Sequence, residues 1–136
     1  MNLQMRTQQI VPPVFMKKNA EDRVFQVRYL QGLNLVSVKG WSITADVHDK
    51  YSQLLLDIRS HLIVRDTLNV HFKYDLFNGT TAKYLFRIIK AMNNAHRDGK
   101  TVKIYWSCDT ENEKEMIETG LDYAGMCDFN FEITYS

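Results

Sequence analysis

Five short segments of this chain alternate apolar and polar residues, as strands do when only one of their faces is buried. They lie at 23–29, 33–39, 67–74, 101–106 and 128–134. Strands that are covered on both faces read instead as continuous apolar runs. The alternation therefore predicts a sheet with one covered face and one open, polar face, and it argues against a doubly wound fold of three layers.

Segments with helical spacing separate the last four of these strands. The helices are predicted after Asp46, a good N-cap residue, then from about Thr80 to His96 and from about Glu111 to Ala124. Helical crossovers imply parallel pairing, whereas the first two strands, joined at Gln31-Gly32, read as an antiparallel hairpin. The expected order is β-β-α-β-α-β-α-β. This is an α/β two-layer sandwich, in which a mixed five-stranded sheet carries the helices mainly on one face.

The N-terminal residues do not follow this pattern. Residues 1–13 are polar and irregular and include Pro12-Pro13, which opposes a helix. We therefore expect a loose tail over 1–13 and a single domain over 14–136, with Val14–Met16 extended against the domain edge. A length of 136 residues and a hydrophobic content of 45% suit one globular domain.

Composition and charge argue against several classes of partner. The formal net charge is +1, so no global field attracts nucleic acid or anionic lipid. No apolar run approaches the roughly 18 residues of a membrane helix, and the N-terminus lacks the apolar core of a signal peptide. Cys108 and Cys127 are isolated and read as reduced packing thiols. We therefore expect a cytoplasmic protein without a nucleic-acid or membrane partner.

The sequence has no motif that predicts a catalytic, metal or cofactor site. The four histidines are scattered, and neither a glycine-rich phosphate loop nor a nucleophile elbow is present. The acidic residues from Asp109 to Glu115 suit a helix N-terminus, which favours negative charge. We expect no catalysis, no metal and no cofactor. A small enzyme that uses the loop of Cys108 and Asp109 is the remaining enzymatic alternative.

The turn between the third strand and the next helix carries two adjacent hydroxyls, Thr80 and Thr81. Thr81 also begins the inward-facing stripe of that helix. In the simplest interpretation Asn78 or Thr80 caps the helix and Gly79 relaxes the turn. In the functional interpretation the turn is a phosphorylation switch. A phosphate there meets free N–H groups and the helix dipole, adds about −1.5 to −2 charges and can pair with Lys83.

This turn belongs to a series of short motifs in a fixed order. Phe77–Lys83 resembles the pattern F-N-[TS]-[ST]-[ST]-x-K, and Gly40–Asp46 loosely fits G-x-S-x-x-[EN]. Four further motifs follow in the same order. They are a strand ending in W-x-x-[DE] (Lys103–Asp109), an acidic stretch (Thr110–Glu115), a helix with a central glycine (Gly120–Ala124) and an F-x-F-x-I strand (Phe129–Ile133). From about Val14 to Ile133 the sequence thus resembles the SiaC-type regulatory phosphoproteins of bacteria.

The resemblance implies a fold like that of the anti-sigma-factor antagonists and a switch protein that is not an enzyme. It also implies that a kinase phosphorylates the turn, that a metal-dependent phosphatase reverses this, and that the unphosphorylated form binds and activates a diguanylate cyclase. Asn78, Gly79, Lys83 and Ser42, which lie in the matching motifs, are then the expected partner-binding residues.

Gly79 departs from the family pattern. It stands directly after the asparagine, where the resemblance places the phosphorylated hydroxyl, and glycine has no hydroxyl to modify. Two alternatives follow. Either the acceptor is Thr80 or Thr81, with Thr80 preferred, or the chain is a constitutive protein-binding module that has lost the switch.

Overall fold

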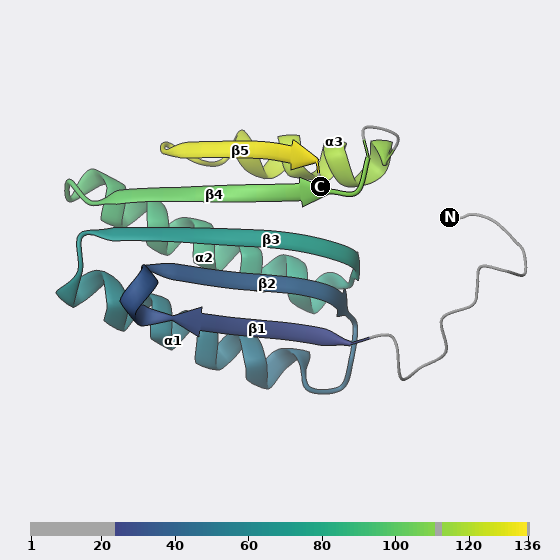
Figure 1. Ribbon diagram of the computed structural model, residues 1–136, viewed down its shortest axis with the longest axis horizontal. Coiled ribbons are helices and arrows are strands. Elements are labelled where there is room, and N and C mark those ends of the chain that lie inside the picture. Colours follow the sequence, from purple (N-terminus) through teal and green to yellow (C-terminus); the bar gives the residue numbers. More distant parts are fainter. Residues whose placement is uncertain (1–23, 111–112, 136) are drawn as a thin grey trace, which may run out of the picture.

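The computed structural model describes residues 24–110 and 113–135, and these residues form the predicted succession of strands and helices (Figure 1). A hairpin comes first, and three helix–strand units follow it. The strands are β1 (Phe25–Leu30), β2 (Leu35–Ser42), β3 (Thr67–Phe77), β4 (Thr101–Cys108) and β5 (Asn130–Tyr135), and the helices are α1 (Val47–Val64), α2 (Gly79–Arg97) and α3 (Lys114–Ala124). The predicted tail over 1–13 and the extended segment Val14–Met16 lie outside the described residues.

The five strands form one mixed sheet in the order β1-β2-β3-β4-β5. β1 pairs antiparallel with β2, and all the other neighbours are parallel. The three helices lie together on one face of the sheet and leave the other face open (Figure 1). This confirms the predicted two-layer α/β architecture.

The alternation in β3 shows why the sheet has one covered face. Leu68, Val70, Phe72 and Tyr74 are buried, whereas His71 between them is exposed. The buried residues pack against the inward stripes of the helices, which include Tyr51, Leu54 and Ile58 of α1 and Leu85, Ile88 and Met92 of α2. Burial of each such side chain contributes about 1.5–3 kcal/mol.

The segment from Gly40 to Ala45, predicted as a loop, is in part a strand. β2 continues to Ser42, and its register against β3 shifts between Gly40 and Trp41. Gly40 has a φ of 105°, and a Cβ there would lie 2.1 Å from the carbonyl oxygen of Val24. The glycine therefore allows the strand to bend and continue, so that Ser42 reaches the end of the sheet.

The hairpin turn is longer than the Gln31-Gly32 pair expected from the sequence. Gln31–Leu33 form a short 3-10 turn, and Asn34, which follows it, has a positive φ of 52°. Asparagine tolerates this conformation better than most residues. The third helix begins at Lys114, whereas the predicted start at Glu111 lies outside the described residues.

Candidate functional site

The turn that joins β3 to α2 is one residue long. β3 ends at Phe77, α2 begins at Gly79, and Asn78 between them has the extended backbone of an N-cap residue. Its Oδ1 accepts a hydrogen bond from the backbone N–H of Thr81 at 3.1 Å. Asn78 is therefore the helix cap, one of the two residues that the sequence suggested for this role.

The two threonines of the turn lie in opposite environments. Thr80 is exposed, as are Asn78, Gly79 and Lys83, whereas Thr81 is fully buried. The Thr81 hydroxyl donates to the backbone carbonyl of Ser42 at 3.0 Å and lies 2.6 Å from the Ser42 hydroxyl. Of the two predicted acceptors, only Thr80 is therefore exposed.

Ser42 belongs to a buried cluster of hydroxyls beneath the turn. Its Oγ lies 3.1 Å from the hydroxyl of Tyr51 in α1, which in turn hydrogen-bonds the hydroxyl of Tyr74 in β3. Burial raises the pKa of Tyr51 to about 12, so this phenol is neutral at physiological pH. The family resemblance implied that Ser42 contacts a partner, but its side chain is buried. We therefore assign it to the support of the turn.

The surroundings of Thr80 suit a phosphate. Thr80 is the second residue of α2, and the first N–H groups of a helix have no acceptor within it. The first turn of α2 contains no acidic residue, and Lys83 is exposed three positions further on. A phosphate on Thr80 would thus meet N–H donors, the positive end of the helix dipole and a cation.

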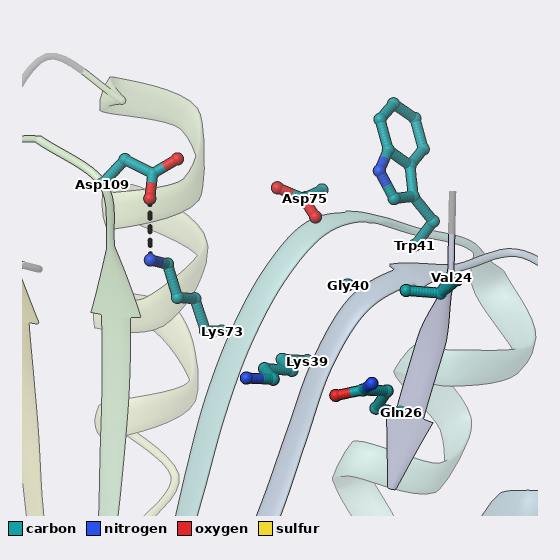
Figure 2. A pocket seen from close by; sticks show the side chains of 8 residues that line it. All are labelled: Val24, Gln26, Lys39, Gly40, Trp41, Lys73, Asp75 and Asp109. Carbon is teal, nitrogen blue, oxygen red and sulfur yellow. Dashed lines mark ion pairs between the residues drawn. The ribbon is translucent and has the colours of Figure 1, made fainter. Parts of the chain in front are cut away.

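A shallow pocket of about 490 Å³ opens at the same end of the sheet, on its open face (Figure 2). Lys73 and Asp109 form an ion pair across it, with 2.8 Å between Nζ and Oδ1. The hydrogen bond to Asp109 raises the pKa of Lys73. Trp41 and Asp75 line the same pocket. No sequence motif predicted this pocket, because its lining residues come from three strands and from the loop after β4.

Cys108 is a buried thiol and does not resemble an activated nucleophile. Burial, followed by the charges of Glu113 and Asp109, raises the pKa of Cys108 to about 11. A catalytic cysteine requires the opposite shift. Among residues 24–110 and 113–135, no three His, Cys, Asp or Glu side chains gather in a way that could hold a metal ion.

Comparison with known proteins identifies the family. The family profile for SiaC family regulatory phosphoproteins matches residues 19–136. The chain belongs to the SiaC family. A search of curated proteins found no match.

Solved SiaC structures have the same fold. A chain in the crystal structure of the diguanylate cyclase SiaD in complex with its activator SiaC, from Pseudomonas aeruginosa, aligns with a TM-score of 0.77 and 19% identity. The alignment covers 83% of this chain and 93% of that chain. Apo-SiaC from the same organism aligns with a TM-score of 0.72 and 20% identity, over 81% and 89% of the two chains. At this identity the likeness establishes the fold.

Membership of the SiaC family makes the chain a regulatory phosphoprotein rather than an enzyme. In the described part of the chain, no helix has the length and apolar character needed to cross a membrane.

Proposed function

We propose that this SiaC-family protein is the phosphorylation-regulated binding component of a partner-switching system, with Thr80 as its acceptor. A kinase transfers a phosphoryl group to the Thr80 hydroxyl, and a metal-dependent phosphatase removes it. The unphosphorylated protein binds an output protein such as a diguanylate cyclase. The P. aeruginosa complex supports this kind of output, since SiaC there is the activator of a diguanylate cyclase.

The contrast between Thr80 and Thr81 carries the choice of acceptor. A kinase must bring the acceptor hydroxyl into line with the γ-phosphate of ATP. Thr80 is exposed and reaches solvent without rearrangement, whereas Thr81 has no exposed surface. Phosphorylation of Thr81 would break its contacts with Ser42 and place a charged group inside the core, which is strongly unfavourable.

A phosphate on Thr80 would act at the docking surface itself. Asn78, Gly79, Thr80 and Lys83 are exposed together at one end of the domain. A phosphate adds about −1.5 to −2 charges and so makes the electrostatic potential of this surface more negative. The Asn78 cap and the buried core stay intact. The same fold can therefore exist in a binding form and a non-binding form.

Binding of the output protein tests the proposal directly. The affinity of the wild type is compared with those of Thr80→Asp and of the uncharged control Thr80→Asn. We expect at least a tenfold loss of affinity in Thr80→Asp and little change in Thr80→Asn. Equal affinities for all three proteins would contradict a switch at Thr80.

Gly79 supports a second candidate function, a constitutive binding module without a switch. Apart from its chain neighbours and the backbone of its own helix, no heavy atom lies within 4 Å of a Cβ built on Gly79, so a serine fits at this position without displacing another side chain. The variant Gly79→Ser therefore restores a hydroxyl where the resemblance places the acceptor. A kinase that phosphorylates Gly79→Ser and leaves the wild type unmodified would favour the constitutive module.

A further inference from the structure

A groove separates α2 from α3 on the helical side of the domain. α2 packs closely against α1, whereas α3 lies over β4 and β5 near the other edge of the sheet (Figure 1). Two adjoining hollows, of about 430 and 380 Å³, share Phe86 of α2 and Met126 after α3 as lining residues. The two hollows therefore form one continuous surface, which we call the α2–α3 groove.

The middle of the α2–α3 groove is apolar and exposed. Phe86 keeps 58% of its surface accessible, and Met126 keeps 42%. Exposed apolar side chains that gather along a groove are typical of interaction sites, whereas isolated ones need no explanation.

The rim of the groove on α2 is positively charged. Lys83, Arg87, Lys90 and Arg97 line it, and α2 contains no aspartate or glutamate. Arg97 pairs with Asp128 at 3.0 Å, and Arg87 lies 5.3 Å from the ring centre of Tyr84. Within the described residues, neither Lys83 nor Lys90 has an ion-pair partner. The charge that lines the groove is thus only partly neutralised by the domain itself.

We propose that the α2–α3 groove binds an acidic amphipathic helix of a partner protein. The apolar stripe of that helix covers Phe86 and Met126, and carboxylates beside the stripe pair with Lys83 and Lys90. From Lys83 to Arg97 α2 rises about 21 Å, which matches roughly four turns of an incoming helix. This is the helix-in-groove mode of recognition, with anchors at i, i+3, i+4 and i+7.

The groove also reaches the proposed switch. Lys83, at one end of the groove, lies one turn after Thr80 in α2. A phosphate on Thr80 would compete with carboxylates of the partner helix for Lys83. This competition rests on the proposed function, in which Thr80 is phosphorylated. Binding of the helix to the unphosphorylated protein does not depend on it.

The test uses a fluorescein-labelled synthetic helix of sixteen residues with leucines at i, i+3, i+4 and i+7 and glutamates beside them. Fluorescence anisotropy measures its binding to the unphosphorylated full chain. We expect saturable binding that weakens at least tenfold in Phe86→Ala and in Lys90→Glu. Ile63→Ala on α1 and Arg28→Glu on the open sheet face are matched controls, and both should bind as the wild type does.

Several outcomes would overturn the proposal. They are the absence of binding, equal binding of a scrambled peptide, and equal binding by the groove variants and the wild type. Analytical ultracentrifugation of the chain alone is a further check. A dimer that dissociates in Phe86→Ala would contradict the proposal, because the groove would then hold a second copy of the chain. Co-sedimentation with phosphatidylserine vesicles that depends on Phe86 would overturn it in favour of a lipid surface. Because no kinase takes part, failure here leaves the Thr80 switch untouched.

Discussion

The hydroxyl of Thr81 lies 2.6 Å from the hydroxyl of Ser42, although 39 residues separate them in the sequence. This contact joins the first turn of α2 to the end of β2 and continues through Tyr51 into α1. It holds Thr81 inside the domain and thereby leaves Thr80 as the hydroxyl that the turn presents.

Loss of the Thr81 hydroxyl should destabilise the domain. Thr81→Val keeps the shape of the side chain but removes the hydrogen bond to the buried carbonyl of Ser42 and one of the two hydroxyl contacts of the Ser42 Oγ. We expect the free energy of unfolding to fall by about 1–3 kcal/mol in urea denaturation. Thr80→Val makes the same chemical change at an exposed position and should alter the free energy of unfolding by less than about 0.5 kcal/mol. Equal effects of the two substitutions would contradict the opposite environments of the threonines.

Much of this architecture could be predicted from the sequence because it is local. Apolar residues at every second position of β3 predict a strand with one covered face. The apolar stripe that includes Thr81 and Leu85 predicts α2 and the side of it that faces the sheet. The partner of Thr81 could not be predicted in this way. Ser42 reaches it only because β2 bends at Gly40 and shifts its register against β3, and no pattern within β2 shows this.

The pocket and the groove were not predictable for the same reason. The Lys73–Asp109 ion pair joins β3 to the loop after β4, and the groove depends on where α3 lies relative to Phe86. Both are relations between distant segments. By contrast, a glycine inside a helical pattern does indicate close approach to a neighbouring element. Gly120 in α3 fits this, because a Cβ there would lie 2.6 Å from Cδ1 of Trp106.

Gly120→Ala should therefore destabilise the domain, even though alanine is the better helix former. The methyl group would overlap the indole of Trp106, and such overpacking costs about 1–3 kcal/mol. The gain in helix propensity is at most about 1 kcal/mol. Gly79→Ala, in the open first turn of α2, is the matched control and should be neutral or stabilising. Thermal unfolding of the two variants measures the difference, and an increase in Tm for Gly120→Ala would contradict the close packing of α3 on β4.

Both cysteines should resist thiol reagents in the folded protein. Burial raises the pKa of Cys108 to about 11 and that of Cys127 to about 12, so little thiolate exists at pH 8. We expect labelling with Ellman's reagent to be more than about a hundredfold slower than in urea-unfolded protein. The rate should rise with pH up to these raised values. Rapid labelling of Cys108 at neutral pH would revive the enzymatic alternative that uses its loop.

Phosphosite mapping tests the central claim most directly. The chain is incubated with its cognate kinase and ATP, its intact mass is measured, and the modified residue is located by fragmentation. The account predicts a single added phosphate on Thr80, absent from Thr80→Val and retained in folded Thr81→Val. A phosphate on Thr81, or an unmodified wild type under conditions in which Gly79→Ser is phosphorylated, would contradict it.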